Sequence, residues 1–73
     1  MLSKLEKEKL KTIGMKIRQQ REKKNISQSQ LAFEIKTSTR QYQRIEYGEI
    51  NSGIISLYRI SEVLDIHIKD LIS

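Results

Sequence analysis

A run of polar, cationic and aromatic side chains recurs at helical spacing in the middle of the chain. At about 100° per residue, one face of this helix would carry five residues, namely Thr39, Arg40, Gln43, Arg44 and Tyr47. Arg and Gln have paired donors and acceptors that match guanine and adenine edges in the major groove. This face holds no acid, whereas an ordinary solvated face, the alternative interpretation, usually mixes Glu or Asp with its cations. The pattern favours contact with double-stranded DNA.

Two helix-start signals define the elements that would position this face. Ser27 followed by Gln30, and Ser38 followed by Gln41, both have the spacing of a capping box. The serines are eleven residues apart, which leaves room for a helix of about two turns over 28–35 and a tight turn at 35–37. Helix, short turn and helix is the geometry that places a second helix in a DNA groove.

Further positions indicate where helices begin and end. Asn25 tolerates the left-handed conformation that ends a helix, and Gly48 is typical of the residue that follows one. The next helix is predicted to begin at Ser52 or Gly53. Gly14 lies inside the first predicted helix, where glycine costs roughly 1 kcal/mol relative to alanine.

The first twelve residues are rich in Lys and Glu and differ from the rest. We therefore divide the chain into an N-terminal helical extension or arm over 1–12 and a helix-turn-helix domain over 13–73. Ser3 followed by Glu6 is a further capping-box pattern, which favours an extension of the first helix. A basic arm that contacts DNA and a solvated helical turn are the two interpretations of this segment.

Length and composition limit the function classes. A chain of 73 residues forms one domain with a small core. It has 14 basic and 9 acidic residues, a formal net charge of +5, which suits a nucleic-acid partner. Cysteine is absent and His67 is the lone histidine, so we expect no metal site, no cofactor and no enzymatic activity.

No apolar run approaches the roughly 20 residues that cross a bilayer, and the chain begins with charged, helix-forming sequence. No signal peptide is evident. We expect a cytoplasmic protein of a bacterium or a phage, with no membrane partner.

Taken together, these motifs resemble the phage-repressor (Cro/Xre-like) helix-turn-helix family. The resemblance covers about residues 13–72 and implies an all-α fold, a five-helix lambda-repressor-like domain that binds specific DNA sequences and usually acts as a dimer. The residues that carry it are Ile13-Gly14, Ile17-Arg18, Arg21, Ser27-Gln28, Leu31-Ala32, Ser38, Tyr42-Gln43-Arg44-Ile45-Glu46, Gly48, Leu57, Ile60, Leu64, Ile66 and Leu71.

The resemblance also implies roles for single residues. Gln28, at the start of the second helix, would meet a phosphate. Ser38 would flank the base-reading residues, which are Thr39, Arg40, Gln43 and Arg44, while Tyr47 shares their face. The loop at 49–51 would lie near the opposite strand, although Glu49 is a poor residue for that position.

Two more features follow from the family pattern. Arg21 and Glu46 match positions that form an ion pair across the core. Lys36 stands where the family usually has glycine, so a positive φ there would cost roughly 1–2 kcal/mol.

Apolar residues are in surplus towards the C-terminus. Ile54 and Ile55 fall outside the inward stripe of the fourth helix, and an interface is the usual reason for such a surplus. We expect a homodimer formed through helices 4 and 5, unless these residues pack under the last helix. The expected contributors are Val63, Ile66, Ile68 and Ile72.

The sequence therefore predicts a transcriptional regulator, in the first place a repressor, that binds a palindromic operator through the major groove as a homodimer. An antitoxin or another protein-interaction module with the same fold is the alternative. The operator sequence, any protein partner and the phage, restriction-modification or mobile-element context stay open.

Overall fold

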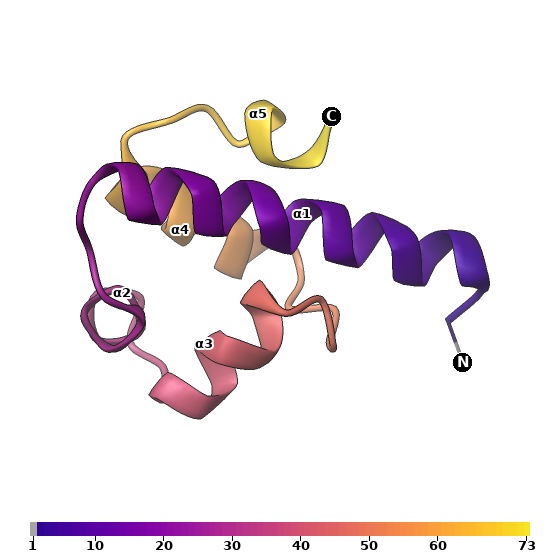
Figure 1. The fold of residues 1–73 in the computed structure, drawn as a ribbon, viewed down its shortest axis with the longest axis horizontal. Helices are drawn as coiled ribbons and strands as arrows, with labels where there is room; N and C mark the ends of the chain where they lie inside the picture. The colour runs from indigo at the N-terminus through magenta and orange to yellow at the C-terminus, as the bar shows by residue number, and fades with distance from the viewer. Residues whose placement is uncertain (1) are drawn as a thin grey trace.

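A computed structural model describes residues 2–73, which form five helices and no strand (Figure 1). The predicted all-α, five-helix fold is confirmed. The helices are α1 (Lys4–Lys23), α2 (Gln28–Glu34), α3 (Thr39–Glu46), α4 (Ile54–Leu64) and α5 (Lys69–Ile72).

The N-terminal segment is the first part of α1. The Ser3 hydroxyl accepts a hydrogen bond from the Glu6 N–H at 3.1 Å, and the Glu6 carboxylate accepts one from the Ser3 N–H at 2.8 Å. This reciprocal box starts α1 at Lys4, so the helix runs without a break through residues 12 and 13. Of the segment over 1–12, only Met1 lies outside the described residues.

Serine caps also start the two central helices. The Ser27 hydroxyl accepts from the Gln30 N–H, and the Ser38 hydroxyl accepts from the Gln41 N–H, both at 3.0 Å. Within residues 2–73, only the box at Ser3 is reciprocal. At α2 and α3 only the serine half of the predicted capping box is present. Each serine oxygen satisfies one free N–H of the first helical turn, which is enough to start the helix.

Left-handed residues end these helices. Asn25 has φ 55° and Gly48 has φ 72°, as their types predict, and Lys36 has φ 63° in the turn between α2 and α3. Of the two positions predicted for the start of the next helix, Ser52 and Gly53, it is Gly53 that directly precedes α4 as its N-cap. Gly53 has φ 85°, a conformation that suits glycine and not serine.

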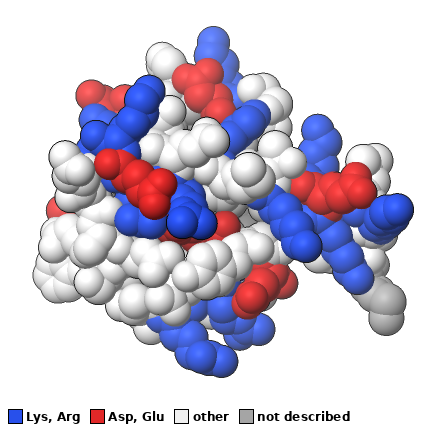
Figure 2. Space-filling view, viewed as in Figure 1, with Lys and Arg blue, Asp and Glu red and all other residues white. Residues whose placement is uncertain are grey.

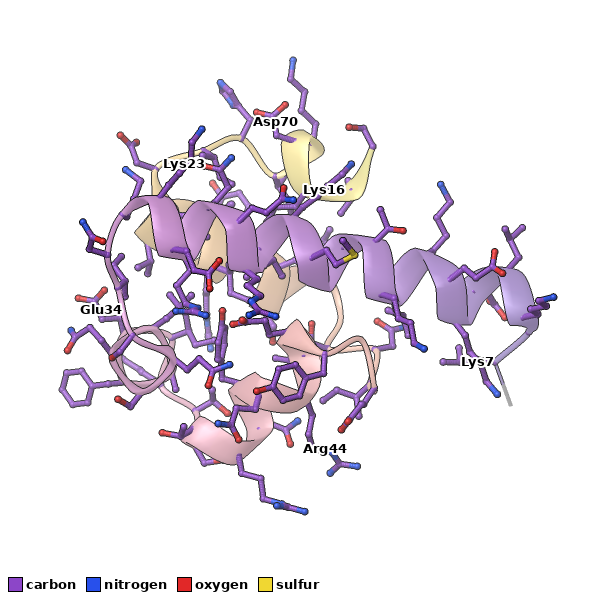
Figure 3. The ribbon with its side chains drawn as sticks, in the orientation of Figure 1. Lys7, Lys16, Lys23, Glu34, Arg44 and Asp70 are labelled. Atoms are coloured by element: carbon purple, nitrogen blue, oxygen red, sulfur yellow. The ribbon has the colours of Figure 1, made fainter. Side chains whose placement is uncertain are left out.

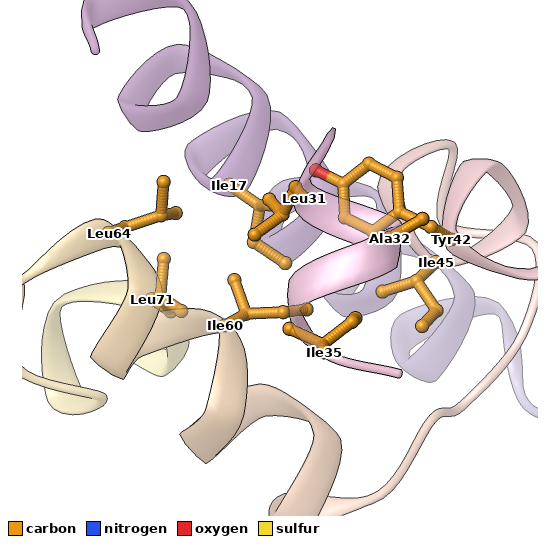
Figure 4. Packing of buried hydrophobic residues seen from close by; sticks show 9 residues of the cluster. All are labelled: Ile17, Leu31, Ala32, Ile35, Tyr42, Ile45, Ile60, Leu64 and Leu71. Atoms are coloured by element: carbon orange, nitrogen blue, oxygen red, sulfur yellow. The ribbon is translucent and has the colours of Figure 1, made fainter. Parts of the chain in front are cut away.

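All five helices, with the residue that follows α2, contribute to one core (Figure 4). Tyr42 is fully buried in this core, and no hydrogen-bond partner for its hydroxyl is found among the described residues. Phe33, near the end of α2, lies outside this core and is 77% exposed. The buried apolar residues are Ile17, Leu31, Ala32, Ile35, Tyr42, Ile45, Ile60, Leu64 and Leu71.

The C-terminus packs back on α1, where the Lys16 ammonium group donates to the Ser73 carbonyl. None of the helices in the described part of the chain is long and apolar enough to span a bilayer.

Candidate nucleic-acid interface

The two faces of α3 have opposite environments. Tyr42, Ile45 and Glu46 are buried, whereas Thr39 and Arg40 are exposed on the other side. Figure 3 shows Arg44 projecting from α3 away from α1. The helix therefore presents its cationic side chains to solvent while its apolar side packs on the core.

Two of the expected DNA-binding residues are bonded to each other. The Gln43 side-chain amide donates to Gln28 Oε1 at 3.0 Å, and Gln28 Nε2 donates to the Tyr47 hydroxyl at 3.3 Å. Gln43 and Gln28 are half-buried, and Tyr47 is 48% exposed. These bonds join the start of α2 to the outer side of α3, so Gln28 and Gln43 have fixed positions relative to Arg44.

Ser38 is exposed, but its hydroxyl is occupied by the cap of α3. The residue therefore positions Thr39 and Arg40, which follow it directly, by fixing where the helix begins.

An exposed ion pair borders the outer face of α3. Arg44 Nε lies 3.9 Å from Glu49 Oε1, and the two side chains are 49% and 57% exposed. Such exposed pairs contribute little, typically about 0–1 kcal/mol. Glu49 thus adds one negative charge beside the cationic face without fixing Arg44.

A buried ion pair holds the inner face. Arg21 Nη2 lies 2.9 Å from Glu46 Oε1, and Arg21 Nε donates to Glu46 Oε2 at 3.0 Å, so the expected partners meet in a two-pronged contact. The Arg21 side chain is 10% exposed and that of Glu46 is fully buried. Arg21 Nη1 also donates to the Ile26 carbonyl at 2.7 Å. The pair thereby links α1, α3 and the loop before α2.

The electrostatics of this pair follow from its burial and its bonds. Burial acts to raise the pKa of Glu46, but the hydrogen bonds from Arg21 and the charge of Arg21 leave that pKa below its usual value. The hydrogen bond to Glu46 raises the pKa of Arg21. Burial raises the pKa of Tyr42 far above its usual range. Glu46 is therefore ionised and Tyr42 neutral at neutral pH.

Gly14 lets α1 and α3 approach closely. A Cβ atom at this position would lie 2.1 Å from the Glu46 carbonyl oxygen. The sequence predicted only a cost for this glycine and missed its contact. A signal was present, since Gly14 and Arg21 are seven residues apart and so share one face of a helix.

The residues expected at a dimer interface differ in exposure. Val63 and Ile66 are partly buried against the core, Ile68 is half-buried, and Ile72 is 42% exposed. The most exposed apolar residues of this region lie in the first turns of α4, and they are Ile54 (59%), Ile55 (64%) and Tyr58 (53%).

Figure 2 shows cations spread over much of this face, including the lower edge of the molecule and the projecting end at the right, with acids interspersed among them. Among residues 2–73, no three His, Cys, Asp or Glu side chains lie close enough to hold a metal ion.

Comparisons with known proteins agree with this geometry. A family model described as helix-turn-helix matches residues 17–71. A solved structure, the restriction-modification controller protein C.AhdI from Aeromonas hydrophila, superposes with a TM-score of 0.83 at 26% identity and covers 89% of this chain and 94% of that chain. No curated protein matches.

Proposed function

Because this chain belongs to the Cro/Xre-like helix-turn-helix family of DNA-binding transcription regulators, we propose that it is a repressor that binds a palindromic operator as a homodimer. The single observation that carries the proposal is the outer face of α3. It combines exposed Thr39, Arg40 and Arg44 with an inner face fixed by burial. A rigid helix with free cations on one side suits the major groove.

Roles within this face follow from the contacts. Arg44 and Arg40 are exposed and read base edges, as arginine does best at guanine. Gln28 contacts a phosphate, and its bond to Gln43 sets the register between the phosphate contact and the base contacts. Thr39, Gln43 and Tyr47 complete the surface.

Selection of bound duplexes from random DNA gives the operator and tests the proposal. Arg44→Ala should then relax one base position and cost about 1–3 kcal/mol there, measured on single-base operator variants. Gln28→Ala is the matched comparison and should weaken all variants alike. A uniform loss for Arg44→Ala would make Arg44 a backbone contact, and selection that yields no preferred sequence would overturn the proposal.

The homodimer forms through α4 and α5, which leave α3 free. Val63 and Ile66 already contribute to the core, so Ile55, Tyr58 and Ile72 offer the free apolar surface. A two-fold dimer must set its recognition helices about 34 Å apart, one turn of DNA. Light scattering at tens of micromolar should give a dimer, and Ile55→Glu should give a monomer with unchanged helix content. A wild-type monomer at that concentration would contradict this part of the proposal.

The similarity to a restriction-modification controller favours one of the contexts that the sequence left open. We therefore place this regulator in the control of a restriction-modification system. Measuring whether the selected operator lies upstream of such genes tests this assignment.

A further inference from the structure

The first turns of α1 extend past the C-terminal end of α3, the proposed recognition helix. α1 crosses the C-terminal end of α3 at Gly14 and Lys11, because a Cβ on Gly48 would lie 2.6 Å from the Lys11 Cα. The residues before Lys11 therefore project beyond that end (Figure 1). At 1.5 Å per residue, Lys4 lies about 10 Å further along the helix than Lys11. This projecting part also precedes the region that the family model matches, which begins at residue 17.

One side of the projecting part is cationic. At about 100° per residue, Lys7 and Lys11 lie roughly 20° and 60° around α1 from Gly14, and Lys4 lies roughly 80° away in the same direction. Glu6 falls on the opposite side of Gly14, where its carboxylate caps Ser3. Because Gly14 faces α3, these three lysines, which we call the lysine row, are on the α3 side of α1.

The side chains agree with this placement. Figure 3 shows Lys7 pointing to the side of α1 on which α3 and Arg44 lie, while Lys16 lies on the α5 side. All three residues of the lysine row are exposed. None of them forms an ion pair with a carboxylate of residues 2–73.

We propose that the lysine row binds phosphates of the DNA backbone beyond the segment that α3 reads. The inference rests on the proposed function, since DNA in contact with the outer face of α3 would continue past Glu46 beneath the row. A lysine ammonium is a flexible point charge that suits a phosphate and needs no fixed angle. Contacts of this kind add affinity and salt dependence but no sequence information.

The test compares two double variants that each remove two charges from α1. Lys4→Gln/Lys7→Gln changes the row, and Lys9→Gln/Lys23→Gln changes two exposed lysines on the far side of the same helix. The probe is a random-sequence duplex of about 30 base pairs, with affinity measured between about 50 and 200 mM salt. Each lost phosphate contact should reduce the slope of log K against log salt by about 0.9.

Wild-type protein should then lose about tenfold more affinity across this salt range than the row variant, per bound protomer. The far-side variant should keep most of the wild-type slope. Equal changes in the two variants, or no change in either, overturn the inference while wild-type binding leaves the proposed function intact. A wild-type protein that binds neither this duplex nor any selected sequence overturns the proposed function and the inference together.

Discussion

The two sides of α3 each carry an Arg–Glu pair, and the pairs differ in almost every respect. On the inner side, Arg21 and Glu46 lie 2.9 Å apart with side chains 10% and 0% exposed. On the outer side, Arg44 and Glu49 lie 3.9 Å apart with side chains about half exposed. The same two residue types thus form a rigid cross-link where water is excluded and a loose contact where it is not.

This difference explains how one short helix can be both fixed and available. The close approach at Gly14 and the buried pair join α3 to α1, and the Gln28–Gln43 bond joins it to α2. A helix of eight residues has little stability alone, so these contacts define its position. The outer cations, Arg40 and Arg44, remain exposed to solvent.

The largest expected effect comes from removing the buried acid. Glu46→Ala leaves the Arg21 charge buried without its partner, which typically costs about 3–5 kcal/mol. A domain this small has only about 3–5 kcal/mol of stability, so we expect a largely unfolded chain by circular dichroism. Arg21→Met/Glu46→Leu should recover much of the loss, because no charge stays buried. A loss of less than about 1 kcal/mol in the free energy of unfolding on Glu46→Ala would contradict this prediction, because an exposed ion pair such as Arg44–Glu49 has an effect of that size.

The same pair should make stability depend on acid pH. The pKa of Glu46 is lower in the folded chain than its usual 4.5, so folding favours the ionised form. The stabilisation is therefore present above about pH 4.5 and is lost as pH falls through the folded pKa. Urea unfolding of wild type and Glu46→Gln between pH 7 and 3 measures this. The two curves should converge towards low pH, and parallel curves would contradict the prediction.

Gly14→Ala should be the next most damaging change. The added Cβ would lie 2.1 Å from the Glu46 carbonyl oxygen, so α1 and α3 must move apart. We expect a loss of about 1–3 kcal/mol from overpacking, despite a gain of about 1 kcal/mol in helix propensity. Met15→Ala, at the neighbouring position, which is 61% exposed, is the control and should change stability little. If Gly14→Ala stabilised the protein instead, α1 and α3 would be able to move apart at little cost, which would contradict the prediction.

The start and end of α3 could be predicted from the sequence, because the residues that set them act on their close neighbours along the chain. Ser38 and Gly48 act within a few residues of themselves, through a side-chain oxygen at one end and a left-handed φ at the other. The all-α fold and the alternation of inward and outward residues on α3 follow from the same short-range rules.

What the sequence did not predict depends on neighbours distant along the chain. The role of Gly14 requires knowing that the Glu46 carbonyl lies against it. The bond between Gln28 and Gln43 requires the crossing of α2 and α3. Likewise, Val63 and Ile66 contact the core while Ile54 and Ile55 do not, and helical periodicity alone cannot separate the two kinds.

A smaller effect is expected in the turn that sets α3 against α2. Lys36 adopts φ 63°, a conformation that is strained for a residue with a Cβ. Lys36→Gly should relieve this strain, and the extra flexibility of unfolded glycine offsets part of the gain. We expect a stabilisation of about 0.5–1 kcal/mol in urea unfolding. Glu34→Gly, two residues earlier and at the last position of α2, should instead destabilise, since glycine within a helix costs up to about 1 kcal/mol.

The smallest effect on stability should come from the outer pair. Glu49→Gln removes an exposed acid 3.9 Å from Arg44, so the free energy of unfolding should change by less than about 1 kcal/mol. DNA binding should nevertheless improve, because Arg44 no longer shares its charge and the phosphates meet one negative charge fewer. A change of about 0.5–1 kcal/mol corresponds to a two- to fivefold gain in affinity, similar for every operator variant.

Asp70→Asn is the control. It removes the same charge on the α5 side, away from Arg44 (Figure 3), and should leave DNA affinity nearly unchanged. An equal gain in DNA affinity for both variants would mean that only the net charge of the protein matters. It would contradict the placement of the DNA against the outer face of α3.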